Sequence, residues 1–399
     1  MRFVFFVLIV FACSASATEV DWQTSVDTTI YSYASIMRLQ SDSIVNPSNQ
    51  FARLEQNNEN LEARLNLKAE NETFLIKARP IIILKKSYNS FSHDSHHEAY
   101  LSQWQVRMRA NDSISLDAGR VLLNWGAAQF RSPSSPFYFD NGRSNPMLEL
   151  SGVDVVKVTL ATDKHGSAQV GYVVDSGYQS PQPDPWRNSW LFKVDRHGDR
   201  WAAGVAIVKP QERSDFFGVN GQISINDALM LYTEMSSATQ SNVLNSPANV
   251  TLPFSVSSES SRKSTELIGA SYTFENGQSF MAEYLHEGQG YTPAEERAYF
   301  LRAVNQPAMA LGLAPRLLGR DYLYFVLQSN QLESKRYWRV MMTHSMTDHS
   351  NEISGYGEAL VYKQVSAFAI GVLHGKNAQQ EFSSLFENSI TLGLKIALP

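Results

Sequence analysis

The last residues of the chain, Asn388 to Pro399, read N-S-I-T-L-G-L-K-I-A-L-P. Large apolar residues occupy every second position from Ile390 to Leu398, and small or polar residues stand between them. Because successive side chains of a strand point to opposite faces, this period of two places all the large apolar groups on one face. A strand of about ten residues with one apolar face is typical of a membrane-spanning β-barrel. We interpret this stretch as the strand that closes such a barrel.

The first residues of the chain predict a signal peptide. Arg2 is followed by an apolar run from Phe3 to Ala12, which is too short to cross a membrane as a helix. Ala15-Ser16-Ala17 then supplies the small residues of a cleavage site. We therefore expect residues 1–17 to be removed and residues 18–399 to form the mature protein.

Further features of the sequence limit the classes of protein to which the chain can belong. Val10 to Cys13 also resembles a lipoprotein site, but Phe11 suits such a site poorly, so ordinary cleavage is favoured. Cleavage removes the single cysteine, and the mature chain then depends on burial and hydrogen bonds and not on disulfides. The 34 basic and 39 acidic residues give a formal net charge of −5, which argues against a nucleic-acid partner.

From Val26 onward, alternating segments recur, and short and long connections take turns. Tight turns such as Asn111-Asp112 and Asn226-Asp227 alternate with long polar segments such as residues 87–98. Pro80 lies inside one alternating segment, where it cannot donate to a ladder, and it indicates a bulge. No segment reaches eighteen consecutive apolar residues, so we expect no transmembrane helix.

This pattern predicts an all-β fold, a single transmembrane antiparallel β-barrel of about 18 strands, with 16 possible. The first strand is expected at Val26 to Arg38. With the N-terminus in the periplasm, the tight turns fall on the periplasmic side and the long segments fall outside the cell. Such a barrel resides in the cell outer membrane, contacts outer-membrane lipid and lipopolysaccharide, and depends on the barrel-assembly machinery for insertion.

If the large alternating residues face lipid, their neighbours face the lumen. On the early strands these are basic, and the wall that they form comprises Arg64, Lys68, Lys77, Arg79, Arg107 and Arg109. On the later strands the expected lumen residues are tyrosines with scattered charges, namely Glu234, Glu283, Tyr322, Tyr324, Arg339 and Glu358. A basic wall in a narrow cylinder concentrates anions and favours anionic or polar solutes. The alternative is that these charges only neutralise one another.

Residues 119–126, G-R-V-L-L-N-W-G, break the alternation near Gly119, as a bulge does. Such a bulge is expected to turn Arg120 inward and Trp125 toward the outer aromatic girdle. The G-R-x-x-x-x-W-G pattern resembles one in Gram-negative outer-membrane porin-like and alginate-export-like barrels, and residues 287–291 and 318–324 are similar to segments of the same group. The resemblance implies a monomeric channel of 16 to 18 strands for small organic solutes or acidic polysaccharide. It also implies that Arg120 and Arg320 are lumen residues.

Two long segments are expected to cover or narrow the pore. Residues 127–147 are rich in proline and aromatic residues, and infolding into the pore is favoured over a surface loop. In the second segment, residues 288–318, Thr292 can cap a helix, Pro293 suits its first position and Glu295 completes a capping box. This helix is expected to end near Asn305 and to act as a lid.

Two histidine-containing stretches are candidates for chemistry beyond transport. The stretch from His93 to Glu98 and the pair His344 and His349 crowd imidazoles and carboxylates, but their spacing imposes no metal geometry. We therefore expect no metal site and no cofactor. The sequence also lacks the common hydrolase and phosphate-loop motifs, so an enzyme is not expected.

The sequence therefore predicts a porin-like channel for small polar or anionic solutes, including sugars or acidic saccharides. The alternatives are a polysaccharide-export or structural outer-membrane barrel, a barrel enzyme acting on envelope lipids, and a secreted carbohydrate-binding module.

Overall fold

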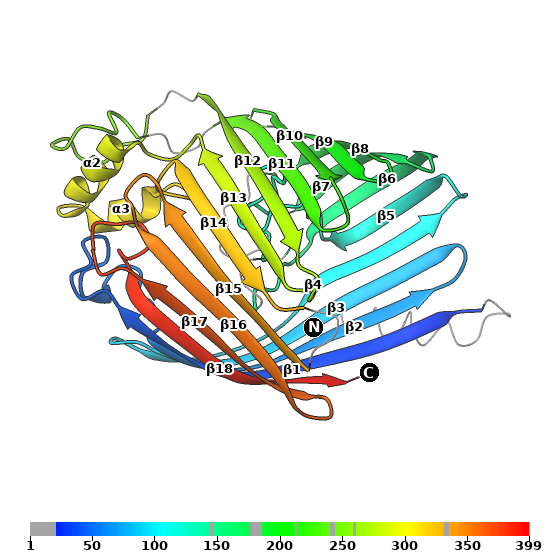
Figure 1. Ribbon diagram of the computed structural model, residues 1–399, viewed down its shortest axis with the longest axis horizontal. Helices are drawn as coiled ribbons and strands as arrows, with labels where there is room; N and C mark the ends of the chain where they lie inside the picture. Colours follow the sequence, from blue (N-terminus) through cyan, green and yellow to red (C-terminus); the bar gives the residue numbers. More distant parts are fainter. Residues whose placement is uncertain are drawn as a thin grey trace.

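The computed structural model describes residues 21–143, 147–175, 177, 186–211, 214–239, 244–257, 261–330 and 335–398. Within these residues, eighteen strands form one antiparallel sheet that closes on itself (Figure 1). Every strand pairs with its neighbour in sequence, and β1 (Gln23–Leu39) pairs with β18 (Phe386–Leu398), for example Ile30 opposite Ile396. The predicted all-β barrel of about 18 strands is therefore confirmed. The predicted signal peptide, residues 1–17, lies outside the described residues.

The remaining strands follow in chain order. They are β2 (Asn57–Glu70), β3 (Phe74–Tyr88), β4 (His93–Arg109), β5 (Ile114–Val121), β6 (Val153–Asp163), β7 (Gly166–Asp175), β8 (Ser189–His197), β9 (Trp201–Pro210), β10 (Phe216–Ser224), β11 (Leu229–Thr239), β12 (Arg262–Thr273), β13 (Ser279–Glu287), β14 (Asp321–Gln328), β15 (Arg336–Ser345), β16 (Asn351–Tyr362) and β17 (Val365–His374). No helix in the described ranges has the length and apolar character needed to cross a membrane.

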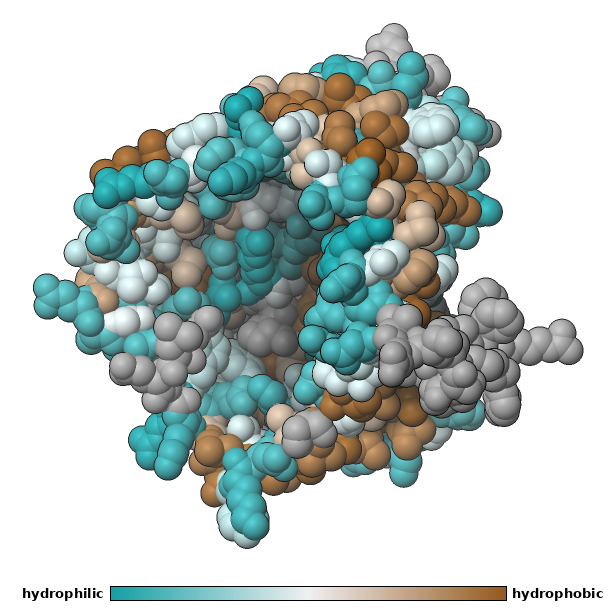
Figure 2. All heavy atoms as spheres, turned by 90° about the vertical axis from the view of Figure 1, so that its right-hand side faces the viewer, coloured by the Kyte–Doolittle hydropathy of each residue, from teal (hydrophilic) through white to brown (hydrophobic). Residues whose placement is uncertain are grey.

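The large alternating side chains point away from the barrel interior. On β18, Ile390, Leu392 and Leu394 are 50%, 56% and 48% exposed. In contrast, charged residues such as Arg64 and Glu234 are buried inside, at 5% and 1% exposure. Figure 2 shows the same division, with a hollow lined mainly by hydrophilic residues and hydrophobic residues on the outside. An apolar exterior around a polar interior is the arrangement that a lipid bilayer requires of a barrel.

The connections differ in length between the two ends of the barrel. One end carries tight turns such as residues 71–73 and 225–228, and the other carries long segments and both α-helices (Figure 1). The prediction that residues 87–98 form a long connection is wrong, because these residues are mostly strand. β3 and β4 continue as a hairpin to the connection at residues 89–92. Polar residues are compatible with strand there, because a hairpin that extends beyond lipid is exposed to water on both faces.

The bulge expected at Pro80 is present. Arg79 pairs with Gln103 and Pro80 pairs with Leu101, which leaves Ser102 as the extra residue of β4. The hydroxyl of Ser102 donates to the carbonyl of Arg79 at 3.1 Å. Proline has no N–H to donate to a neighbouring strand. At a bulge one hydrogen bond of the ladder is skipped, so Pro80 can lie in a central strand without the loss of a further bond.

The helix expected after Thr292 is also present. Helix α2 (Pro293–Ala303) has Thr292 as its N-cap and Pro293 in its first turn. The Thr292 hydroxyl accepts from the Glu295 N–H, and the Glu295 carboxylate accepts from the Thr292 N–H at 2.8 Å. The capping box is therefore confirmed, and the helix ends close to the predicted point. A second helix, α3 (Pro307–Leu313), was not predicted.

The long-connection end is held together by its own apolar cluster. The cluster joins α2, α3 and two other connections, and its buried members are Val45, Leu244, Phe254, Tyr291, Tyr299, Phe300, Ala303, Ala310 and Leu318. We refer to residues 40–56, 244–257, 288–320, 346–350 and 375–385 together as the cap.

Candidate pore and the segment folded into it

The basic wall lies on the inner face of β2, β3 and β4. Lys68 stands directly opposite Lys77, and Lys77 stands opposite Gln105. These side chains border a cavity of about 310 Å³. Its other polar lining residues are Ser25, Asp27, Asn66, Arg79, Gln103 and Arg120.

Acidic residues that the sequence analysis did not single out neutralise part of this wall. Arg64 is held by Glu62 at 2.7 Å and by Glu149 at 3.2 Å, and its side chain is only 7% exposed. Glu149 also pairs with Arg79 at 3.0 Å. Burial raises the pKa of Glu149, although Arg79 and Arg64 act in the opposite direction. Arg64 is therefore buried in ion pairs that hold the structure together. The Arg79 side chain, in contrast, keeps 32% of its surface exposed.

A second group of charges lies nearer the short turns. Asp117, which is fully buried, accepts from Arg107 at 2.7 Å and pairs with Lys157 at 3.3 Å. Lys68 pairs with Glu70 but remains 40% exposed. For Lys77, no ion pair is found within the described ranges of the chain. Lys68 and Lys77 both reach the cavity, and Asp27 of β1 borders it as well.

Arg109 and Arg120 make other contacts. Arg109 donates to the carbonyls of Asn71 and Glu72, in the turn after β2, at 3.3 and 3.2 Å. Arg120 is bidentate to Asp154 at 2.9 and 3.0 Å and donates to the Leu101 carbonyl. Arg120 also borders the cavity, and its role as a lumen residue stays a prediction.

On the other side of the barrel, a buried carboxylate of β11 holds residues 122–143 and 147–152, which we call the infolded segment. Glu234 accepts from the Ala128 N–H at 2.8 Å, from the Ser132 hydroxyl at 2.6 Å and from the Ser134 hydroxyl at 2.7 Å. Bonds from neutral donors to an ionised acceptor are stronger than bonds between neutral groups. Glu234 therefore works as an anchor and not as a free pore charge.

The last glycine of the G-R-x-x-x-x-W-G pattern has a role at this anchor. Gly126 has φ +78, and a Cβ atom there would lie 1.9 Å from Oε1 of Glu234. Only glycine adopts this backbone freely and leaves room for the carboxylate.

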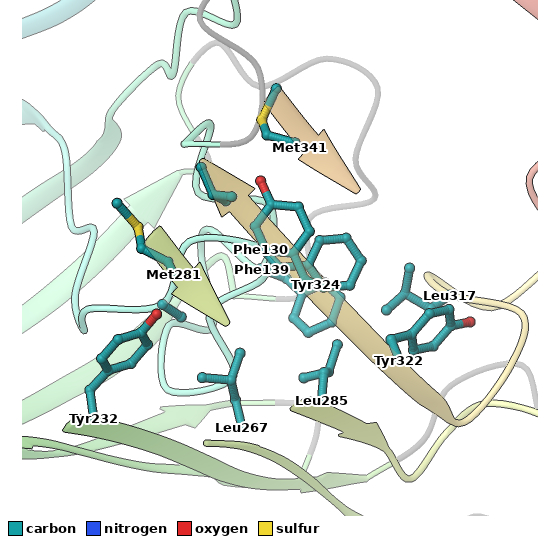
Figure 3. Close-up of a cluster of buried hydrophobic side chains, with 12 residues drawn as sticks. Phe130, Phe139, Tyr232, Leu267, Met281, Leu285, Leu317, Tyr322, Tyr324 and Met341 are labelled. Carbon is teal, nitrogen blue, oxygen red and sulfur yellow. The ribbon is translucent and has the colours of Figure 1, made fainter. Parts of the chain in front are cut away.

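A second carboxylate, on β13, extends the anchor. Glu283 accepts from the N–H groups of Gln129 and Phe130 at 2.6 and 2.8 Å and from the Tyr232 hydroxyl at 2.6 Å. The Phe130 ring stacks on Tyr324, with centroids 5.0 Å apart and planes inclined by 20°. Figure 3 shows Phe130 and Phe139 packed beside Tyr324 among the inward side chains of the wall.

The C-terminal part of the infolded segment is hydrogen-bonded to the basic wall. Arg64 donates to the Met147 carbonyl at 3.0 Å, and Gln103 donates to the Leu150 carbonyl at 3.2 Å. β11 and β13 are separated from β2 and β4 by at least six strands in either direction around the sheet. The infolded segment is therefore fastened to opposite walls and crosses the lumen.

The remaining residues expected in the lumen are also engaged. Tyr322 donates to Glu381 at 2.6 Å, and Glu358 pairs with Lys395 at 3.1 Å. Arg339 is 7% exposed and lies 3.4 Å from the Gln129 amide oxygen. Arg320 precedes β14 and donates to the Gly290 carbonyl at 2.9 Å and to Glu295 at 3.3 Å, which fastens α2. Glu358 and Arg320 are thus held by charged partners that the sequence alone did not identify.

Trp125 does not lie in an outer girdle, and that prediction is wrong. Its ring packs against Phe137 with centroids 5.9 Å apart, and the Lys193 ammonium lies 5.3 Å from it. β5 ends at Val121, so the alternation stops before Trp125 and the chain turns into the barrel.

The histidine-rich stretch forms part of β4 and is exposed. His96 lies 3.3 Å from Glu98, and His344 contacts the Asn351 side chain at 2.9 Å. Within the part of the chain that the structure describes, no group of three or more His, Cys, Asp or Glu side chains is arranged to hold a metal ion.

Solved structures with a similar arrangement are known. OccAB1 of Acinetobacter baumannii aligns with a TM-score of 0.58 and 10% identity, over 96% of this chain and 98% of that chain. The chain has the fold of outer-membrane porins. OccK5 (OpdH) of Pseudomonas aeruginosa gives a TM-score of 0.57 at 10% identity over 95% and 98% of the two chains, and OprD of the same species gives 0.54 at 10% over 94% and 95%.

At this identity the likeness concerns the fold alone. No family model and no curated protein matches the sequence. The proposed likeness to alginate-export-like barrels therefore stays a prediction.

Proposed function

We propose that the chain is an outer-membrane channel through which small polar or anionic solutes pass between the infolded segment and the basic wall. The observation that carries this proposal is the cavity bordered by Lys68 and Lys77, because Lys77 has no ion pair within the described residues. The porin fold and the apolar exterior support it. The neighbours in fold are porins, which are channels and not enzymes.

The proposal includes the surroundings of the barrel. The exposed apolar side chains contact outer-membrane lipid, and the cap end faces outward near lipopolysaccharide. Insertion by the barrel-assembly machinery follows from the barrel fold. The solute is a small molecule, because the infolded segment crosses the lumen and narrows it.

The charge of the wall predicts the direction of selectivity. A monovalent anion about 4 Å from one lysine gains about 1 kcal/mol in water, which raises its local concentration about fivefold. At 1 M salt the screening length falls to about 3 Å, so the preference should fade. A solute with a carboxylate and a polar body should therefore pass better than a cation of equal size.

The test is the reversal potential of the purified protein in a planar bilayer under a KCl gradient near 0.1 M. The wild type is expected to prefer chloride, and the double substitution Lys68→Gln with Lys77→Gln is expected to lose most of that preference. Lys164→Gln, which alters an exposed lysine between β6 and β7, is the matched control and should change little. An unchanged reversal potential in the double variant would contradict the proposed path.

A further inference from the structure

Three carboxyl groups from three different segments meet inside the cap. Glu296 lies in the first turn of α2, Asp348 lies between β15 and β16, and Glu381 lies between β17 and β18. All three act on one another electrostatically. The proposed channel function assigns no role to this group.

Two of the three carboxyl groups have the donors that an ionised carboxylate needs. Asp348 accepts from the Glu381 N–H at 2.7 Å and from the Ser350 N–H and hydroxyl at 2.9 and 2.7 Å. Glu381 accepts from the Leu318 N–H at 2.7 Å and from the Tyr322 hydroxyl at 2.6 Å. Both carboxyl groups therefore have hydrogen-bond donors directed at their oxygens.

Glu296 has the opposite surroundings. It is 2% exposed, and within the described residues neither of its oxygens receives a hydrogen bond from a donor. Its carboxyl lies within hydrogen-bonding reach of Asp348, and Glu381 is near. An anion in this position would be buried, without donors and beside two negative charges, which is the costliest state for a carboxyl group. A neutral Glu296 removes the cost and donates its O–H to Asp348.

Among the residues that the structure describes, the charges that act on Glu296 are those of Asp348 and Glu381, and no cation is among them. The titratable side chains that feel its charge, Tyr299 and Tyr322, are neutral phenols. Arg320, which fastens α2, binds Glu295 and the Gly290 carbonyl. Arg302 binds the Pro253 carbonyl at 2.7 Å.

We propose that Glu296 and Asp348 form a proton-dependent latch that holds α2 against the β15–β16 and β17–β18 connections, and that loss of the shared proton loosens the cap. The latch acts on the cap and does not itself depend on conduction. Its use as a gate for solutes rests on the proposed function. In that role the channel entrance would be firm in acid and mobile in alkali.

The titration of these groups supports this direction. Burial, followed by the charges of Asp348 and Glu381, raises the pKa of Glu296 to about 9. Burial also raises the pKa of Glu381 to about 7, against the opposing effect of its bond from Tyr322. An acid with a raised pKa stabilises the folded cap fully below its ordinary pKa of about 4.5. That stabilisation decreases as pH rises and is lost by about pH 9.

Hydrogen exchange of the α2 amides in detergent-solubilised protein, measured from pH 6 to pH 9, tests the latch. After correction for the intrinsic exchange rate, release of one proton on opening predicts an increase of up to tenfold per pH unit in the wild type. In Glu296→Gln, whose amide can donate to Asp348 at any pH, this slope should disappear between pH 7 and pH 9, above the pKa of Glu381 of about 7. Glu275→Gln, in the exposed turn after β12, should keep the wild-type slope.

An equal slope in the wild type and in Glu296→Gln, or no slope in the wild type, would overturn the proposal. If Glu296→Gln fails to fold, Asp348→Asn serves as the second variant, and its slope should shift toward lower pH because one negative neighbour is removed. Single-channel recording of the same proteins separates the two proposals. A protein that never conducts but shows the expected exchange slope keeps the latch and loses the channel.

Discussion

The anchor at Glu234 gives the sharpest prediction about how the pore is shaped. Replacing Glu234 with alanine leaves the Ala128 N–H, the two serine hydroxyls and the Ser134 N–H without their acceptor. An unsatisfied buried donor costs about 1–3 kcal/mol, and water that enters the gap recovers part of it. A net loss of about 4 kcal/mol shifts the ratio of docked to undocked segment by about a thousandfold.

Single-channel conductance is the assay for this change. With its first anchor removed, the infolded segment should leave the lumen for part of the time, so Glu234→Ala should show a higher mean conductance and added noise. Glu234→Gln removes the same charge but retains one acceptor oxygen, so it should show a smaller change. This comparison separates the loss of the anchor from the loss of a negative charge in the pore.

The barrel wall should remain intact in both variants, since heat-modifiable migration on gels depends on the strands and not on the segment. Conductance and noise equal to those of the wild type in Glu234→Ala would refute the anchor.

Three other changes follow from contacts in the same structure. Gly126→Ala should act like Glu234→Ala in conductance recordings, because the added methyl group overlaps the anchoring carboxylate and φ is +78; wild-type recordings would contradict this. Phe130→Ala should weaken docking of the segment by about 3 kcal/mol through lost burial and stacking, seen as faster hydrogen exchange at residues 127–132, whereas exchange in β13 should not change. Arg320→Gln should loosen α2 by about 1 kcal/mol, because its bonds to Gly290 and Glu295 are partly exposed, and limited proteolysis within residues 293–303 should become faster; unchanged cleavage would count against that role.

The fold could be predicted from the sequence because lipid imposes a simple rule on a barrel. Each strand must place apolar residues outward at every second position, and stretches such as Ile390 to Leu398 show that rule directly. The capping box at Thr292 and Glu295 was equally local, since its donors and acceptors lie within one helical turn. Both predictions needed no knowledge of distant parts of the chain.

The interior was harder to predict because its partners are far apart in sequence. Glu234 meets Ala128 across 106 positions, and Arg64 meets Met147 across 83. Alternation shows that a side chain faces inward. It does not show whether that side chain binds another segment of the chain, forms an ion pair or contacts a solute. Trp125 illustrates the limit, because the alternating pattern gives no sign that the chain leaves the wall after Val121.

The most direct test of the central claim introduces single cysteines into the barrel. The one cysteine of the sequence, Cys13, lies within the predicted signal peptide. Cleavage of that peptide as predicted leaves no other thiol, so that Lys77→Cys and Leu392→Cys can each be treated with a membrane-impermeant, negatively charged thiol reagent while current is recorded. The account predicts a stepwise fall in chloride current for Lys77→Cys, which borders the inner cavity, and no change for Leu392→Cys, which faces lipid. A current that is unaffected at Lys77→Cys, or blocked at Leu392→Cys, would contradict it.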